Sequence, residues 1–266
     1  KEALDKCEVD WFVGDIRDRA VVEAAVENVH GIIHLAAHTS VIDSQVDPLH
    51  DFEVNVHGTL NLLQIARAYK TPRFIFASSN APIGENQPPI DENKPARPLS
   101  PYGASKLAGE GYCSAFWGSY GLGTVVLRFA NVYGPRSTHK GSVVAKFIKD
   151  AFQTGVLTIY GNGNQTRDFI YVEDLSRAII AGVESECGGE TFQIATGHET
   201  TIEELANLLK ALLPQSIEIV HAEQRAGEII KNYSAIDKAK RVLGWAPQVD
   251  LQHGLAHAET MVPMLI

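Results

Sequence analysis

The sequence has few cysteines, no long apolar run and little positive charge. Its three cysteines lie far apart and form no Cys-x-x-Cys pair, which favours a reduced cytoplasmic protein over a secreted disulfide scaffold. No stretch approaches the roughly 18 consecutive apolar residues of a membrane span, and residues 1–10 are too charged for the apolar core of a signal peptide. We therefore expect a protein that stays in water.

The charge balance limits the partners of the chain. Lys and Arg total 23 against 32 Asp and Glu, a net charge of -9, so the protein would repel a phosphate backbone and no nucleic-acid partner is expected. Its 266 residues are 45% hydrophobic and 21% charged, which is typical of a globular protein and excludes disorder, collagen and coiled coil.

Short β-branched runs alternate with longer helical patterns, which predicts an α/β protein with parallel strands joined by helical crossovers. The predicted strands are residues 9–13, 31–35, 73–77, 123–129 and 191–195. The predicted helices between them are residues 20–28, 51–70 and 102–120. The last helix has the clearest limits, because Ser100 is an N-cap residue, Pro101 suits the first turn and Gly121 is a stop signal.

The alternation breaks down after Gly134. There the pattern predicts helices at 143–154, 172–184 and 201–213 and a loop rich in Gly and Asn at 161–164. We predict a first domain at residues 1–133 and a smaller lobe at 134–266, with residues 165–197 returning to the first sheet.

Three polar side chains suggest a site for proton transfer. Tyr102 and Lys106 lie four residues apart on a predicted helix, so they project from one face. Ser78 and Ser79 follow an apolar strand, and parallel sheets place reactive groups at the carboxyl ends of their strands. Lys106 would lower the pKa of Tyr102, Tyr102 would act as the base, and Ser79 would hold the reacting oxygen. The alternative for Tyr102 and Lys106 is a pair of exposed side chains on a helix, and the alternative for the two serines is a turn or a helix cap.

Six motifs occur in an order that resembles the extended short-chain dehydrogenase/reductase family, the nucleotide-sugar epimerases and dehydratases. The motifs are Gly14-Asp15-Ile-Arg-Asp18, His34-Leu-Ala-Ala37, Phe76-Ala-Ser-Ser79, Tyr102-Gly-Ala-Ser-Lys106, Arg128-Phe-Ala-Asn131-Val-Tyr-Gly-Pro135 and Arg167-Asp168-Phe-Ile-Tyr-Val-Glu-Asp174. The resemblance implies a doubly wound, mostly parallel Rossmann-type sheet with a smaller C-terminal substrate lobe. It also implies an enzyme that binds NAD in the first domain and regenerates it within each turnover, with catalytic Ser79, Tyr102 and Lys106 and no metal.

The resemblance also assigns binding positions. It implies that Asp15 and Ile16 hold the adenine, that Ala36 and Ala37 let the backbone approach the cofactor, and that Tyr102 and Lys106 also contact it. For a nucleotide-diphosphate sugar substrate it implies Ser79, Asn131, Lys146, Tyr160, Arg167, Arg225 and Glu228. Tight packing is the alternative for the two alanines, and a surface ion pair is the alternative for each arginine.

The residues after Ser79 bear on the choice of reaction. Dehydratases of the family carry an Asp-Glu pair there, whereas this sequence has Asn80 and Ala81, so it favours 4-epimerisation of UDP-glucose and UDP-galactose over elimination. A 4,6-dehydratase, another NAD-dependent enzyme of sugar nucleotides, and a non-catalytic NAD-binding or truncated protein are the alternatives. Pro82-Ile83-Gly84 departs from the commoner Val-Tyr-Gly, which leaves N-acetylated sugars open.

The glycine-rich turn with which the family begins is not in this sequence. In that family the turn, Gly-x-x-Gly-x-x-Gly, brings the pyrophosphate onto a helix N-terminus. We expect Lys1 to mark the start of a fragment, or of the residue numbering, rather than the start of the natural polypeptide. A protein without the glycine-rich turn would bind NAD weakly. The long predicted helices 51–70 and 102–120 also imply a homodimer, as in the family.

Overall fold

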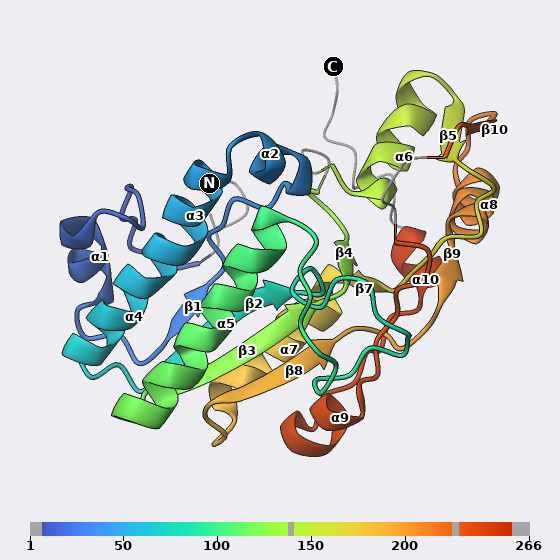
Figure 1. Cartoon of the computed structure of the whole chain (residues 1–266). Helices are drawn as coiled ribbons and strands as arrows, with labels where there is room; N and C mark the ends of the chain where they lie inside the picture. The colour runs from blue at the N-terminus through green and yellow to red at the C-terminus, as the bar shows by residue number, and fades with distance from the viewer. Residues whose placement is uncertain (1–6, 138–140, 225–228, 257–266) are drawn as a thin grey trace.

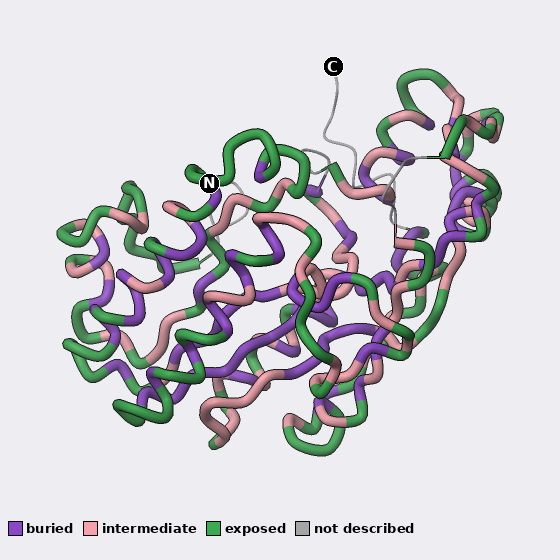
Figure 2. The backbone as a smooth tube through the Cα atoms, in the orientation of Figure 1, coloured by how far each residue is buried: buried purple, intermediate pink, exposed green. Residues whose placement is uncertain are grey.

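A four-stranded parallel sheet lies at the centre of the computed structural model, which describes residues 7–137, 141–224 and 229–256 (Figure 1). The strands are, in spatial order, β1 (Ile32–His34), β2 (Arg73–Ser79), β3 (Gly123–Phe129) and β8 (Glu190–Ile194). Their pairing places residue 79 at the end of β2 beside Phe129 of β3. Figure 2 shows that β2 and β3 are almost wholly buried, as their apolar runs predict for strands covered on both faces.

Helices cover both faces of this sheet (Figure 1). One face carries α1 (Arg19–Val26), α4 (Gly58–Ala68) and α5 (Pro101–Tyr120), whose apolar side chains form one core with Phe74 and Phe76. The other face carries α7 (Val172–Glu184) and α9 (Asp237–Leu243), which form a second core with β2, β3 and β8. This arrangement confirms the predicted α/β class with a doubly wound parallel sheet.

Helix α5 begins and ends where its sequence signals predict. The Ser100 hydroxyl accepts a hydrogen bond from the backbone N–H of Gly103 at 3.1 Å, and Pro101 occupies the first turn. Gly121 ends the helix with a φ of +68°, in the left-handed region that favours glycine. These contacts fix the position of Tyr102 in the first turn.

The predicted helix over 51–70 forms as an unbroken helical stretch over 48–68, which contains a π-helical turn that the sequence pattern did not predict. That stretch lies in α3 (Pro48–Phe52), a π-helical turn (Glu53–His57) and α4, preceded by the short α2 (Val41–Val46). The π turn contains Asn55, whose side chain forms hydrogen bonds outside the helix with the backbone of His38 and with the Ser105 hydroxyl. These tertiary contacts accompany the local change from α-helical to π-helical hydrogen bonding.

The predicted strand at 9–13 does not form. A strand requires a neighbour that completes its hydrogen-bond ladder, and the described residues place no strand beside this segment. Val13 is accordingly 92% exposed. The other predicted strands form, with ends that differ by up to two residues.

The remaining elements build a smaller lobe with its own apolar core, which includes Tyr133, Phe147 and Leu205. Its three two-stranded pairs are β5–β10, β4–β7 and β6–β9. The strands and helices are β4 (Asn131–Tyr133), α6 (Val143–Gln153), β5 (Val156–Tyr160), β6 (Thr166–Arg167), β7 (Phe169–Tyr171), β9 (Thr200–Thr201), α8 (Ile202–Leu212), β10 (Glu218–Ala222) and α10 (Leu251–Leu255). Across the described ranges, no helix has the length and apolarity to cross a membrane, and no cluster of His, Cys, Asp or Glu could hold a metal ion.

Candidate active site

Ser79 and Tyr102 meet at the carboxyl end of β2. Ser79 is the last residue of the strand, and Tyr102 lies in the first turn of α5. The Ser79 hydroxyl lies close enough to the Tyr102 phenol to act on the pKa of that phenol, which it lowers. Ser79 Oγ also accepts a hydrogen bond from the backbone N–H of Ala81 at 3.0 Å, which holds the hydroxyl in place. The strand end and the helix start therefore present two hydroxyl groups at one point.

Two glycines allow α5 to approach the strand this closely. A Cβ on Gly103 would lie 2.6 Å from the carbonyl oxygen of Ala81, and a Cβ on Gly109 would lie 2.4 Å from the Phe76 ring. A larger residue at either position would push the helix away from β2. The sequence analysis missed both residues, although a glycine inside a helical pattern often indicates a packing constraint.

The Lys106 amine is bound to the strand. Its Nζ donates a hydrogen bond to the carbonyl oxygen of Ala77 at 2.8 Å and lies 4.9 Å from the centre of the Phe76 ring. The residue is 4% exposed. Burial lowers the pKa of Lys106 to about 8, although the negative charge of Asp51 opposes that change.

Lys106 does not lower the pKa of Tyr102 in this structure, so that expectation is wrong here. Burial raises the pKa of Tyr102, the hydrogen bond with Ser79 opposes the rise, and the charge of Asp51 adds to it. The Lys106 amine donates its hydrogen bond to the Ala77 carbonyl. Burial of the phenol is the largest influence on the pKa of Tyr102. Tyr102 consequently carries its proton at neutral pH in the protein without cofactor.

A buried polar cluster beside Tyr102 and Lys106 was not found from the sequence. The Asn55 amide donates hydrogen bonds to the His38 carbonyl at 2.8 Å and to Asp51 Oδ1 at 2.9 Å. Asp51 is 1% exposed, and its charge raises the pKa of both Tyr102 and Lys106. Asp51 and Asn55 are four residues apart in a helical pattern, which is the signal that could have revealed a shared face.

Glu110, one turn beyond Lys106, anchors α5 to the sheet through a buried ion pair. Its two carboxylate oxygens accept hydrogen bonds from Arg128 of β3 at 2.9 and 2.7 Å. Ser78 of β2 donates a further hydrogen bond to Glu110 at 2.6 Å. The exposed fractions of the Arg128 and Glu110 side chains are 8% and 7%. This pair joins two strands to the helix that carries Tyr102 and Lys106.

Two predicted cofactor residues lie before α1. Asp15 is exposed and accepts hydrogen bonds from the backbone and side chain of Arg17, which lower the pKa of Asp15 to about 2. Ile16 is half-buried, and its carbonyl accepts a hydrogen bond from Asn61 of α4 at 2.8 Å. Asp15 is therefore an ionised acceptor held by the neighbouring arginine.

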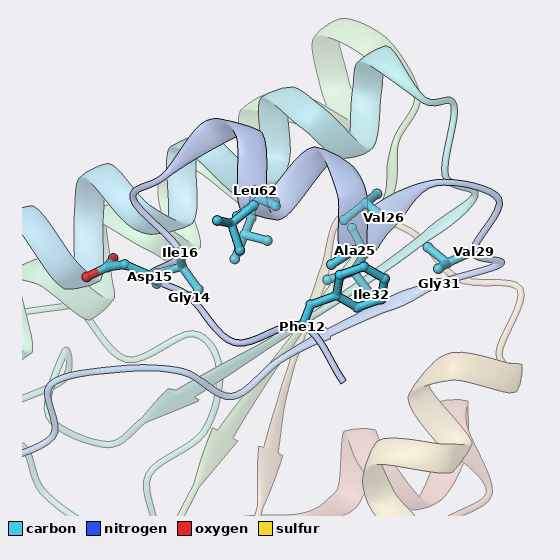
Figure 3. A pocket seen from close by; sticks show the side chains of 12 residues that line it. Phe12, Gly14, Asp15, Ile16, Ala25, Val26, Val29, Gly31, Ile32 and Leu62 are labelled. Carbon is cyan, nitrogen blue, oxygen red and sulfur yellow. The ribbon is translucent and has the colours of Figure 1, made fainter. Parts of the chain in front are cut away.

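An apolar cavity of about 290 Å³ adjoins these residues, between the segment before α1, α1 itself and β1 (Figure 3). Phe12, Val26, Ile32 and Leu62 contribute to its lining, and Figure 3 shows the Asp15 carboxylate turned away from them. Within the described part of the chain, Asp15 is the one charged residue of this lining. The cavity is thus an apolar hollow beside strand β1, with a carboxylate at its rim.

The two predicted alanines follow β1, at the same edge of the sheet as Ser79. Ala36 is exposed and Ala37 is half-buried, so their small side chains leave the backbone accessible. His34 of the same motif is buried and contacts Thr59 of α4 through Nε2 at 2.9 Å; burial lowers the pKa of His34 to about 3. His34 therefore has a structural role, whereas the alanines suit close approach by a ligand.

Three residues predicted for the substrate side line one cavity of the smaller lobe. Lys146 of α6, Tyr160 of β5 and Arg167 of β6 belong to this cavity of about 120 Å³. Lys146 forms an ion pair with Asp150 on the same helix. Asn131 is not among the residues that line this cavity; its amide donates a hydrogen bond to the carbonyl of Asp168, the residue after Arg167, at 3.1 Å. Arg225 and Glu228, also predicted to bind substrate, lie outside the described residues.

Comparison with known proteins identifies the family. The sequence model of the NAD dependent epimerase/dehydratase family matches residues 2–195. The chain belongs to this family. A UDP-glucose 4-epimerase of Mycolicibacterium smegmatis is 35% identical over 229 residues, which cover 85% of this chain and 73% of that protein. The resemblance inferred from the six motifs is thereby confirmed.

Solved structures of the epimerase/dehydratase family share this fold. A UDP-glucose 4-epimerase of Thermus thermophilus in complex with NAD has a TM-score of 0.90 and 34% identity, with coverage of 98% of this chain and 87% of that chain. A dTDP-glucose 4,6-dehydratase of Streptomyces venezuelae with bound NAD has a TM-score of 0.87 and 30% identity, with coverage of 97% and 81%. A UDP-glucose 4-epimerase of Thermotoga maritima with UDP-glucose has 36% identity and a TM-score of 0.88, with coverage of 93% and 82%.

The family depends on NAD, and the described residues fit part of an NAD site. The small side chains of Ala36, which is exposed, and Ala37, which is half-buried, the acceptor at Asp15 and the buried amine of Lys106 are groups that suit a dinucleotide.

Proposed function

We propose that this protein is a nucleotide-sugar 4-epimerase that interconverts UDP-glucose and UDP-galactose. The observation that carries the proposal is the proximity of the Ser79 hydroxyl, at the end of β2, to the Tyr102 phenol, in the first turn of α5. A hydroxyl that holds the reacting oxygen and a phenol that exchanges its proton are the groups that reversible oxidation of an alcohol requires. Three relatives at 34–36% identity named as UDP-glucose 4-epimerases support the choice of substrate.

In this mechanism the ionised form of Tyr102 would take the proton of the sugar 4-hydroxyl while Ser79 holds the same oxygen. Burial raises the pKa of Tyr102, so the positive charges of Lys106 and of oxidised NAD would be needed to favour that ionised form. NAD, held by the residues assigned below, would supply the acceptor and later the donor of the hydride of carbon 4, and Tyr102 would return the proton to the sugar oxygen. Because proton and hydride both return to the sugar, the reaction has no net redox change.

The remaining predicted residues are given binding roles. Lys106 contacts the cofactor and lends its positive charge, with Asp15 and Ile16 at the adenine and Ala36 and Ala37 beside the backbone of the cofactor. The shared cavity of Lys146, Tyr160 and Arg167 supports a site for the nucleotide diphosphate, to which we also assign Asn131, Arg225 and Glu228. Arginine suits a diphosphate because its guanidinium forms bidentate hydrogen bonds.

Elimination of water is the competing reaction, since a relative at 30% identity is named as a dTDP-glucose 4,6-dehydratase. Elimination requires an acid and a base beside the sugar. Residues 80 and 81 supply an amide and a methyl group in place of two carboxyl groups. The Asn80 amide also donates hydrogen bonds to Asn232 and Ser234. This part of the site therefore favours 4-epimerisation.

The decisive experiment incubates the purified protein with UDP-galactose and NAD and separates the products by chromatography. We expect UDP-glucose to form with no net accumulation of NADH. A parallel incubation with UDP-N-acetylgalactosamine measures the preference for sugars without the N-acetyl group. A 4-keto-6-deoxy product would contradict the proposal and would favour the dehydratase alternative.

We assign the cofactor to residues 1–133 and most substrate contacts to residues 134–266. Residues 165–197 return to the sheet, an assignment supported by the pairing of β8 with β3. Three free cysteines support a reducing, cytoplasmic location.

We also propose a homodimer that forms through α3 and α5. Exposed apolar side chains lie on α2 and α3, among them Val46 and Leu49 at 81% and 65% exposure. A groove of about 240 Å³ between α3 and α5 is lined by Phe52 and Ala104, among others. Analytical ultracentrifugation at micromolar concentration should give a dimer, and Val46→Glu should shift it toward monomer. A wild-type protein that sediments as a monomer would refute this prediction.

A further inference from the structure

One short segment, residues 229–236, connects the substrate lobe to the end of β2. On the lobe side, the carbonyl of Ile230 accepts a hydrogen bond from the backbone N–H of Thr166 in β6 at 2.7 Å. The carbonyl of Ile229 accepts a hydrogen bond from the Arg167 guanidinium at 2.8 Å. The segment thus supports both residues of β6, one of which is the proposed substrate ligand Arg167.

The same segment is bound to the loop between β2 and α5. Ile90 pairs with it as an isolated parallel bridge, donating to the carbonyl of Tyr233 and accepting from the N–H of Ala235, both at 2.9 Å. Closer to Ser79, the side-chain amide of Asn80 donates hydrogen bonds to Ser234 Oγ at 3.0 Å and to Asn232 Oδ1 at 3.3 Å. Asn80 is therefore the point at which the segment is joined directly to the catalytic strand.

The contacts of Ser234 show that the connection between Asn80 and residues 229–236 is well defined. Ser234 is 1% exposed, and its backbone N–H donates a hydrogen bond to Asp168 Oδ2 at 3.3 Å. Asp168 is also 1% exposed and accepts further hydrogen bonds from Thr196 and Gly197. The Asn80 amide thus donates to the side chain of Ser234, a residue whose backbone N–H is bonded to Asp168, the residue after Arg167.

We propose that Asn80 is a positioning residue, whose amide group sets the distance between Ser79 and the substrate lobe. This inference rests on the proposed function, because it concerns how the sugar at Ser79 and the nucleotide at Arg167 are held by one protein. A sugar nucleotide spans both places, so it binds well only when the two are fixed relative to each other. UDP alone also depends on this connection, because the segment that Asn80 holds accepts a hydrogen bond from the Arg167 guanidinium at the carbonyl of Ile229. The residue after Ser79 fixes them through Ser234 and Asn232.

The test compares four variants by calorimetric titration with UDP and by kinetics with UDP-galactose. Asn80→Ala removes two hydrogen bonds, so we expect the Kd for UDP and the KM to rise about tenfold, with kcat within about threefold of wild type. Asn80→Asp should weaken UDP binding similarly, because a carboxylate has no N–H to donate. Ser234→Ala should weaken it less, and its effect should not add to that of Asn80→Ala.

Asn86→Ala is the matched control. Asn86 lies in the same loop, and its amide donates two hydrogen bonds, to the carbonyls of Ile83 and Pro95 at 2.9 and 3.2 Å. It has no contact with residues 229–236 among the described interactions. We expect this variant to bind UDP within about twofold of wild type, which separates positioning from general loosening of the loop.

Two results would overturn the inference. Unchanged UDP binding by both Asn80 variants would show that the hydrogen bonds from Asn80 to Ser234 and Asn232 do not contribute to nucleotide binding. Normal binding by Asn80→Asp with weak binding by Asn80→Ala would show that an oxygen of residue 80 contacts the ligand directly. The calorimetric comparison measures binding and does not need turnover. If the protein has no epimerase activity, the proposed reaction is refuted, but the role of Asn80 in binding is still tested.

Discussion

Replacing Tyr102 with phenylalanine is expected to lower epimerisation by about 10²–10⁴-fold, the usual contribution of a positioned acid or base. The substitution removes only the hydroxyl that lies near Ser79, while the ring stays in its buried place, so the fold should survive. The measurement is the initial rate of UDP-glucose formation from UDP-galactose, with circular dichroism to check the fold.

Tyr120→Phe is the control for that experiment. Tyr120 is the last residue of the same helix and is 50% exposed, so loss of its hydroxyl should leave the rate within about twofold. Activity of Tyr102→Phe within tenfold of wild type would remove Tyr102 from the mechanism.

Breaking the Glu110–Arg128 pair is expected to lower the free energy of unfolding by about 3–5 kcal/mol, because the remaining charge would be buried without its partner. Arg128→Met leaves the Glu110 carboxylate with only the Ser78 hydroxyl as a described partner. The measurement is urea denaturation at neutral pH, monitored by tryptophan fluorescence.

The double variant Glu110→Leu with Arg128→Met separates a charge effect from a packing effect. It leaves no buried charge, so it should recover most of the lost stability, as apolar replacement of buried pairs often does. A single variant as stable as wild type would contradict the prediction, and so would a double variant less stable than either single one.

The sequence predicted those parts of the fold that depend on local signals. Ser100, Pro101 and Gly121 define α5 because capping and backbone geometry act within a few residues. The π turn inside the predicted helix 51–70 could not be predicted, since it contains Asn55, whose hydrogen bonds reach His38, seventeen residues away. The failed strand at 9–13 has a similar cause, because a strand depends on its neighbour.

The sequence predicted which residues form the candidate site better than it predicted how they are arranged. The meeting of Ser79 with Tyr102 follows from a strand end and a helix start, both of which are marked in the sequence. The hydrogen bond of Lys106 to Ala77 and the raised pKa of Tyr102 depend on depth of burial, which periodicity does not give. The neighbouring charge of Asp51 was also beyond reach, because it comes from another helix.

The end of β2 commits four consecutive residues to four different partners. The Ala77 carbonyl accepts a hydrogen bond from Lys106, Ser78 donates one to Glu110, Ser79 lies near the Tyr102 phenol, and Asn80 donates one to the segment 229–236. A substitution here alters one of these contacts, whereas an inserted or deleted residue shifts every later side chain to the opposite side of the strand. A change of length within this tetrapeptide would therefore disturb several contacts at once, whereas a change of length in the loop that follows it would leave all four in place.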